Sequence, residues 1–347
     1  MNPNIWAIIP AHNEEKIIAD TINDLIKQTV PIKVLVVLDN CSDDTEKIVM
    51  EMIPSYRNLF IYTTINNNKK KAGAINQALQ ILPKINIDAV LLMDADTRIH
   101  CKAVETSYAM LEKDHSLAAV CSKAGVLPYD GKNLFQRFLH QVQKLEYSTF
   151  DSQRIETLGQ IKVVHGMAGL HRWSSLQEVG GFDDDNLVED YDLTIRYKMA
   201  GYRTSVQLQM KAWTEVPVNL KEWWKQRLRW NRGGLDTLKK HGWNKITRKY
   251  ILQHVLFVFL TLFQWFFLAM LVLMIFQGHL VMHGLVILIT LLGMATSIYR
   301  LKFLEERSVI DYLFRISLLP EFLYEQIVNI NQLHAYFLFL FNRPQSW

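Results

Sequence analysis

A long uncharged segment is the feature that most constrains the structure of this chain. No aspartate, glutamate, lysine or arginine occurs between Tyr250 and Tyr299. Within it, residues 251–276 would form a helix of about 39 Å at roughly 1.5 Å per residue, longer than a bilayer core of about 30 Å. Residues 280–299 form a second segment of similar character. Because one charge at the centre of a span costs roughly 3 kcal/mol on insertion scales, we predict two membrane spans, 251–276 and 280–299.

Basic residues flank this apolar pair on both sides, whereas the turn between its two segments, residues 277–279, has none. They are Lys245, Arg248 and Lys249 before the pair and Arg300, Lys302 and Arg307 after it. Basic flanks favour the cytoplasmic side of a membrane. We therefore predict a multi-pass membrane protein whose remaining, water-soluble part is cytoplasmic, with residues 277–284 on the opposite side.

Two further segments carry patterns related to membranes. Residues 220–249 include a stretch rich in tryptophan and arginine, which is typical of a helix at the lipid–water interface. Residues 316–341 are mostly apolar, with polar side chains such as Glu321, Glu325 and Asn329 at helical spacing. Such a segment either lies in the interface or spans the membrane with its polar stripe turned inward, and the sequence leaves both interpretations open.

The overall composition excludes several classes of protein. Half of the 347 residues are hydrophobic and 21% are charged, which excludes an intrinsically disordered chain. A net charge of +4, from 38 basic and 34 acidic residues, is too small to indicate a nucleic-acid partner. Three cysteines, none of them in a CxxC pair, exclude a disulfide framework and a cysteine zinc site.

The first part of the chain alternates strand-like and helix-like patterns. Strand-like runs at 5–10, 32–38, 59–62 and 89–93 are followed by helical patterns at 17–26, 42–52, 72–82 and 103–112. Strands that are apolar on both faces and separated by helices predict an α/β fold with a parallel sheet covered on both sides. Ligands of such folds bind at the carboxyl ends of the strands, where Asn13, Asp39 and Asp94 fall.

Two carboxylates one residue apart, Asp94 and Asp96, directly follow the predicted strand at 89–93. Oxygen ligands of this kind suit a hard divalent cation such as Mg²⁺ or Mn²⁺, which keeps positions for phosphate oxygens. A cation held there would neutralise a diphosphate leaving group. Taken alone, the same pair is also compatible with a solvated acidic turn.

Two other motifs have both a chemical and a structural interpretation. Asp190, which follows Glu189 before a helical pattern, is a candidate general base, although an acidic pair at this place also suits the first turn of a helix. Gln226, Arg229 and Trp230 offer hydrogen-bond donors for phosphate and a flat ring for stacking on a sugar. Their composition also suits interfacial anchoring, as we expect for Trp223.

The order of the motifs along the chain is more specific than any one of them. The motifs are IPAHNEE (9–15), DNCSD (39–43), KAGAIN (71–76), DAD (94–96), ED (189–190) and QRLRW (226–230). This series resembles the family-two glycosyltransferases, and more narrowly the membrane-bound branch that includes cellulose, chitin and hyaluronan synthases. The resemblance covers residues 5 to about 235.

The resemblance implies a Rossmann-like, GT-A type catalytic region (1–219) that binds a nucleotide-diphosphate sugar and inverts the anomeric carbon, followed by the interface segment (220–249) and the membrane region (250–347). It implies Asp94 and Asp96 as metal ligands and Asp190 as the catalytic base. The implied donor-binding residues are Pro10, Ala11, His12, Asn13, Glu14, Asp39, Lys71, Asp94, Gln226 and Arg229. The implied acceptor-binding residues are His165, Gly166, Glu189 and Trp230.

Three functional hypotheses follow. The first is a metal-dependent membrane glycosyltransferase that transfers a sugar, most simply from a UDP-sugar, to a saccharide or lipid-linked acceptor at the cytoplasmic face. The second is a processive polysaccharide synthase whose pore is completed by a homo-oligomer or a partner subunit, since two or three apolar segments are few for a self-contained channel. The third is a catalytically silent membrane scaffold, against which the intact carboxylates argue.

Overall fold

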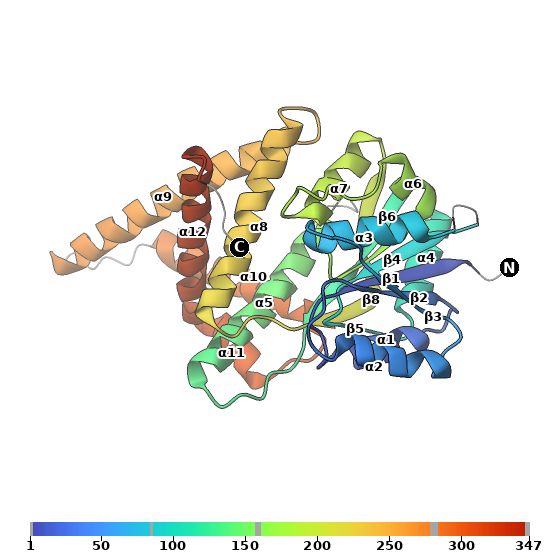
Figure 1. The fold of residues 1–347 in the computed structure, drawn as a ribbon. Helices are drawn as coiled ribbons and strands as arrows, with labels where there is room; N and C mark the ends of the chain where they lie inside the picture. The colour runs from blue at the N-terminus through green and yellow to red at the C-terminus, as the bar shows by residue number, and fades with distance from the viewer. Residues whose placement is uncertain (1–2, 84–85, 157–160, 278–283, 344–347) are drawn as a thin grey trace. The chain divides into compact units, whose positions relative to one another are not determined.

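The computed structural model describes residues 3–83, 86–156, 161–277 and 284–343 (Figure 1). The chain divides into two compact units. We call Met1–Asp130 with Thr149–Val216 the sheet unit, and Gly131–Ser148 with Pro217–Trp347 the helical unit.

The sheet unit is built on one eight-stranded sheet with the order β3-β2-β1-β4-β7-β6-β8-β5. Its strands are β1 (Ile5–Ala11), β2 (Lys33–Leu38), β3 (Leu59–Thr63), β4 (Ala89–Met93), β5 (Thr97–Ile99), β6 (Leu117–Val126), β7 (Ala168–Arg172) and β8 (Arg203–Thr214). The first four strands pair in parallel, as predicted. The second half of the sheet, which was not predicted, makes it mixed: β7 runs antiparallel to both β4 and β6, and β5 runs antiparallel to β8.

The helices of this unit are α1 (Ile18–Ile26), α2 (Thr45–Met52), α3 (Lys70–Ile81), α4 (Ala103–Lys113), α6 (Trp173–Glu178) and α7 (Glu189–Met199), with a 3-10 turn at Ile53–Ser55. Alternate residues of β1 face opposite sides of the sheet. Trp6 and Ile8 join a buried cluster with Ile75 of α3 and Leu193 of α7. Since the intervening Ala7 is also buried, both faces of the central strands are covered, as their apolar sequence predicts.

The helical unit consists of α8 (Leu220–His241), α9 (Arg248–Phe276), α10 (Gly284–Arg300), α11 (Val309–Ser317) and α12 (Leu319–Leu340), with a 3-10 turn at Leu301–Phe303. The first part of α5 (Leu134–Glu156) also belongs to it. Trp223 of α8 is fully buried, and its indole N–H donates to the hydroxyl of Tyr324 of α12 over 2.9 Å. The expectation that Trp223 is an interfacial anchor is therefore wrong, since this side chain belongs to the core of the helical unit.

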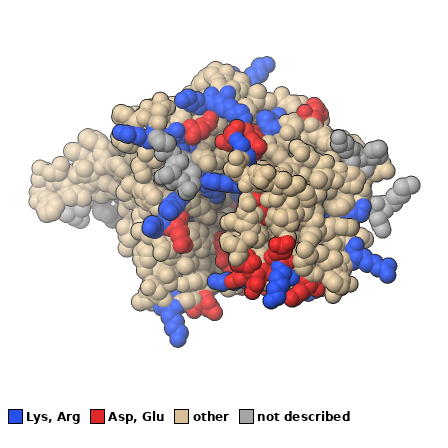
Figure 2. Space-filling view, viewed as in Figure 1, with Lys and Arg blue, Asp and Glu red and all other residues tan. Residues whose placement is uncertain are grey.

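One helix of the described part of the chain is long and apolar enough to cross a membrane, by length and composition alone: Arg248–Met274 within α9. The surface over most of α9 carries no charged side chain in Figure 2. The described part of α10 has 17 residues, about 26 Å of helix, which is less than a bilayer core of about 30 Å. The two predicted spans, and with them the multi-pass topology, are not confirmed. Residues 278–283 lie outside the described residues; they include most of the predicted turn (277–279) and the start of the predicted second span (280–299).

The apolar segment 316–341 contains a helix break that the sequence analysis did not predict. Leu318 adopts a left-handed conformation with φ 57°, and Pro320 stands in the first turn of α12. The polar side chains of α12 pair within the helical unit: Gln326 accepts from the indole N–H of Trp265 over 2.9 Å, and Asn331 accepts from the amide of Asn231 over 3.1 Å. The polar stripe of α12 is thus turned toward neighbouring helices.

The core of the sheet unit generates a prediction about acid stability. His171 of β7 is 4% exposed, with Nδ1 3.0 Å from the hydroxyl of Tyr197, and burial lowers the pKa of His171 to about 3. An unfolded histidine has a pKa of about 6.5, so below that pH the unfolded chain binds a proton that the folded chain does not. The contribution of neutral His171 to the free energy of unfolding is therefore complete above pH 6.5. Below that pH the free energy of unfolding decreases, by up to about 1.4 kcal/mol per pH unit from this residue.

We expect His171→Asn, whose amide oxygen can accept from Tyr197, to lower the stability at pH 7 but to flatten its decline between pH 6.5 and 4. Thermal unfolding midpoints across this range measure the effect. The exposed His115 provides the control, because His115→Asn should follow the wild-type curve. Parallel curves for the wild type and His171→Asn would contradict the assignment.

Candidate active site

The predicted donor residues of the sheet unit gather where β1 and β2 end. The two strands pair in parallel up to Ala11 and Leu38, and the amide of Asp39 donates to the carbonyl of Ala11 over 2.9 Å. His12 Nδ1 lies 2.7 Å from the carbonyl oxygen of Asp39. Pro10 and Ala11 are the last residues of β1, and Ala11 makes the contact with the loop after β2.

Asp39 is buried and is held by three donors on one carboxylate oxygen. Its Oδ1 accepts from Thr64 over 2.7 Å, from Asn67 over 2.8 Å and from Asn40 over 3.0 Å. Asn13 adopts a left-handed backbone (φ 60°), which asparagine tolerates better than most residues, and its side chain accepts from the amide of Ser42 over 2.7 Å. The loops after β1 and β2 are therefore fixed to each other by the residues that the sequence motifs single out.

The lysine of the KAGAIN motif links two of the predicted acidic motifs. Lys71, at the start of α3, forms an ion pair with Asp94 after β4 and lies 3.6 Å from the carboxylate of Glu189 at the start of α7. Burial lowers the pKa of Lys71, but the carboxylates of Asp94 and Glu189 outweigh burial and raise it overall. The side chain is therefore a fixed positive charge between the two acidic motifs.

Gly166 brings the predicted base into this group. Its backbone N–H donates to Oδ2 of Asp190 over 3.1 Å. A methyl group at residue 166 would lie 2.7 Å from Nζ of Lys71 and 3.8 Å from carboxylate oxygens of both Asp190 and Asp94. Asp94, Lys71, Gly166, Glu189 and Asp190, which we call the central cluster, thus meet in one place.

The position of Asp190 in the first turn of α7 fits the structural alternative, and its hydrogen bonds show how the carboxylate is oriented. The residue that caps α7 is Val188, so Asp190 stands inside the first helical turn. Its Oδ1 accepts from the amide of Tyr191 over 2.7 Å, whereas Oδ2 is directed to the Gly166 loop. The carboxylate is therefore oriented by two backbone donors.

His165 lies beside this group as a neutral side chain. Its Nε2 lies 2.9 Å from the carbonyl oxygen of Ser122. Burial, followed by the charge of Arg154, lowers the pKa of His165 to about 3. In the part of the chain that the structure describes, its buried Nδ1 has no hydrogen-bond partner. Because Nε2 faces a carbonyl, it carries the proton, and Nδ1 is an acceptor.

Carboxylates crowd the side of the site next to Asp96. Burial and the neighbouring Asp94 raise the pKa of Asp96 to about 6, and burial, then Asp96 and Asp94, raise the pKa of Glu14 to about 7. Glu215, directly after β8, contributes to both increases and was missed by the sequence analysis, because it carries no motif. This set of hard oxygen donors fits a divalent cation.

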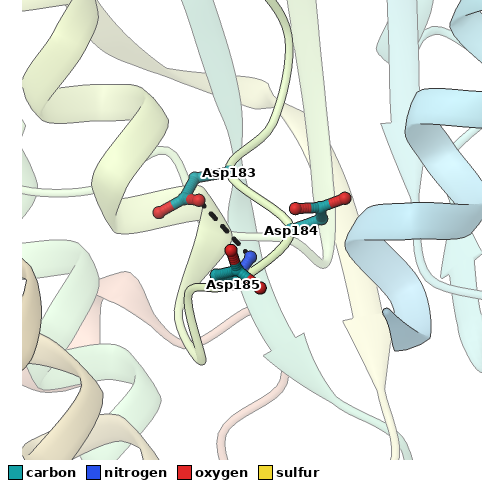
Figure 3. Close-up of side chains that lie close together, drawn as sticks. All are labelled: Asp183, Asp184 and Asp185. Atoms are coloured by element: carbon teal, nitrogen blue, oxygen red, sulfur yellow. Dashed lines mark hydrogen bonds between the residues drawn. The ribbon is translucent and has the colours of Figure 1, made fainter. Parts of the chain in front are cut away.

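A second acidic group lies in the loop before α7, where Asp183, Asp184 and Asp185 offer oxygens within 4.8 Å of one another (Figure 3). The amide of Asp185 donates to Asp183 over 3.3 Å, and its carboxylate pairs with Lys69. The side chain of Asp185 is 75% exposed. Exposed acidic turns are common without a cation, so we assign no metal to this loop.

The remaining predicted residues, Gln226, Arg229 and Trp230, belong to α8 of the helical unit. All three are half-buried. Their assignment to the donor and acceptor sites therefore stays a prediction.

Comparison with known proteins gives a consistent result. Residues 89–299 match the sequence model of a family described as glycosyl transferase family group 2. The chain is 30% identical over 272 residues to the probable glycosyltransferase YdaM of Bacillus subtilis, covering 76% of this chain and 64% of the relative. It is 25% identical over 272 residues to a poly-β-1,6-N-acetyl-D-glucosamine synthase of Staphylococcus aureus, covering 77% of this chain and 63% of the relative. The chain thus spans less than two thirds of the length of these curated relatives.

A solved structure shares the fold. It is that of the mannosyltransferase PcManGT from Pyrobaculum calidifontis in complex with GDP-Man and Mn²⁺. The TM-score is 0.61 at 16% sequence identity, with 99% of this chain and 89% of the other chain covered. At this identity, the likeness supports the fold alone.

Proposed function

The chain belongs to glycosyl transferase family group 2, and from this premise we propose that it transfers a sugar from a nucleotide-diphosphate sugar, most simply a UDP-sugar, to a saccharide or lipid-linked acceptor. The observation that carries the proposal is the central cluster: Asp94, Lys71, Gly166, Glu189 and Asp190 come from distant segments and meet in one place. A donor-side carboxylate and an oriented base side by side are what sugar transfer requires.

On the donor side, Asp94 and Asp96 would hold Mg²⁺ or Mn²⁺, which would neutralise the charge of the departing diphosphate. The solved mannosyltransferase, which contains Mn²⁺ and GDP-Man, makes this choice of cation reasonable. In this proposal, Asp39 and the loop from Pro10 to Glu14 hold the nucleoside. The diphosphate is held by hydrogen bonds from the charged Lys71 and Arg229 and from the neutral amide of Gln226.

On the acceptor side, Asp190 removes the proton from the attacking hydroxyl. The two backbone donors on its carboxylate fix the direction of its lone pairs. As the hydroxyl oxygen bonds to the anomeric carbon, the bond to the diphosphate breaks on the opposite face, which inverts that carbon. In this proposal, Glu189, Gly166, His165 and Trp230 line the acceptor site.

The polarity of the helical unit supports membrane association. Its surface includes Phe259, Phe266 and Leu340, which are 64%, 65% and 73% exposed, whereas Asp311 and Arg315 are at most 1% exposed. A protein surrounded by water shows the reverse distribution. We propose that α9 crosses the membrane and that the catalytic residues act at its cytoplasmic face.

A processive polysaccharide synthase is the second candidate, and the similarity to a poly-β-1,6-N-acetyl-D-glucosamine synthase favours it. The deciding experiment incubates the purified chain with UDP-N-acetylglucosamine, UDP-glucose or GDP-mannose, with and without a soluble N-acetylglucosamine tetramer. Release of the nucleoside diphosphate identifies the donor. The size of the product separates the addition of one sugar from polymerisation, and no release from any donor would reject the proposed function.

The first prediction concerns the cation. Chelation should abolish transfer, Mn²⁺ or Mg²⁺ should restore it, and Asp96→Asn should require a much higher cation concentration or lose activity, because one of two carboxylate ligands is neutralised. Cation titrations of nucleoside diphosphate release measure this. Asp184→Asn, in the acidic loop before α7, is the matched control and should behave as the wild type. Full activity of Asp96→Ala in chelator would reject the metal site.

The second prediction concerns Asp190. Asp190→Asn keeps the shape and the contacts with backbone donors but cannot accept the proton, so turnover should fall by about 10²–10⁴-fold. Donor affinity, measured by calorimetry, should change by less than about threefold. Near-normal turnover would mean that Asp190 serves only the first turn of α7.

The third prediction concerns Trp230. If its indole supports the acceptor sugar, Trp230→Ala should reduce transfer to the tetramer by about 10-fold or more, a loss of stacking in the usual range, while hydrolysis of the donor by water is unchanged. Trp243→Ala, at a 65% exposed tryptophan, is the control. Equal losses of transfer and hydrolysis would contradict an acceptor role.

A further inference from the structure

Arg227 is the second residue of the QRLRW motif and was not among the residues to which the motif assigns a function. It is one of two buried arginines of α8 and is 4% exposed. Its guanidinium group donates to Oε2 of Glu146 of α5 over 2.5 Å. The centre of the guanidinium lies 4.2 Å from the ring centroid of Trp230 and 5.9 Å from that of Trp223.

A hydrogen-bonded chain within the helical unit holds this guanidinium in place. The indole N–H of Trp223 donates to the hydroxyl of Tyr324 over 2.9 Å, and that hydroxyl donates to the same Oε2 of Glu146 over 2.8 Å. Glu146 therefore receives donors from α8 and from α12 at once. A buried network of this kind fixes its members more firmly than single bonds would.

The spacing along α8 places Arg227 against the indole of the motif. Residues three apart on a helix lie on the same face, so Arg227 and Trp230 are neighbours whereas Arg229 points elsewhere. The centre of the guanidinium lies over the indole of Trp230, 4.2 Å from the ring centroid, and so occupies one face of the ring. A sugar ring that stacks on this half-buried indole would have to use the opposite face.

We propose that Arg227 is a positioning residue: it contacts no substrate but fixes the indole of Trp230 in the orientation that receives the acceptor sugar. The proposal rests on the proposed function, because it takes Trp230 as the acceptor platform. Arg227 is unsuited to the donor diphosphate itself, since its side chain is buried and its two terminal nitrogens donate to side chains of the helical unit, Nη2 to Glu146 and Gln143 and Nη1 to Gln226.

The test replaces Arg227 with lysine, which keeps a positive charge for Glu146 but lacks the plane that stacks on the indole. We expect the KM for the N-acetylglucosamine tetramer to rise by about tenfold in Arg227→Lys, because the indole of Trp230 loses the planar partner that fixes its orientation. The KM for the donor and the hydrolysis of the donor by water should stay within about twofold.

Arg232 provides a matched control on the same helix. It is 8% exposed, pairs with Asp236 over 2.9 Å and lies 5.2 Å from the ring of Phe339 rather than near Trp230. Arg232→Lys should lose about as much thermal stability as Arg227→Lys but keep the wild-type KM for the tetramer. An equal rise of that KM in both variants would show a merely structural effect and overturn the proposal.

A double-mutant cycle and a readout independent of activity complete the test. In the Trp230→Ala background, Arg227→Lys should change transfer by less than about twofold, because the residue through which it acts is gone. With 5-fluorotryptophan, the ¹⁹F resonance of Trp230, assigned from Trp230→Phe, should shift or broaden in Arg227→Lys but not in Arg232→Lys.

The outcomes distinguish a failure of the positioning role of Arg227 from a failure of the proposed function. An unchanged resonance in Arg227→Lys, or additive effects in the cycle, would overturn the positioning role whatever the enzyme does. A changed resonance together with normal use of the tetramer by Trp230→Ala would support the arginine–indole contact and reject the acceptor role of Trp230 in the proposed function.

Discussion

The site in the sheet unit depends on the attraction between the ammonium group of Lys71 and the two carboxylates beside it. Lys71 comes from α3 and offsets the repulsion between Asp94, which follows β4, and Glu189, which opens α7. These carboxylates are far apart in the sequence, and bringing them together without a positive charge would be costly. On the other side of Asp94 the repulsion between carboxylates is not offset. Together with burial, it raises the pKa of Asp96 to about 6 and that of Glu14 to about 7. That side of the site therefore favours protons or a cation.

The local patterns of the sequence predicted the first half of the sheet and the places where its strands end. Asn13, Asp39 and Asp94 lie at those ends because a run of apolar residues followed by a polar one marks the end of a buried strand. The antiparallel insertion of β7 between β4 and β6 was not predicted, because it depends on pairing between distant segments. The burial of Trp223 was missed for the same reason, since composition does not reveal its partner on α12.

The helical unit buries charged side chains beside its apolar core. Arg227, Asp311 and Arg315 are buried, each paired within the unit, whereas many apolar side chains are exposed. In apolar surroundings an unpaired polar group is costly, so pairing inside the unit is the stable arrangement. The polar stripe of α12 is explained in this way: its side chains bind neighbouring helices rather than water.

Gly166 shows how closely the parts of the central cluster depend on one another. Its N–H orients Asp190, while a methyl group at the same residue would lie only 2.7 Å from Nζ of Lys71. Glycine is thus the residue that lets the backbone donor reach the base while the ammonium stays beside Asp94. Because the ammonium of Lys71 pairs with Asp94 and also stabilises the charge of Asp190, the proposed donor side and the proposed base side of the site share one positive charge.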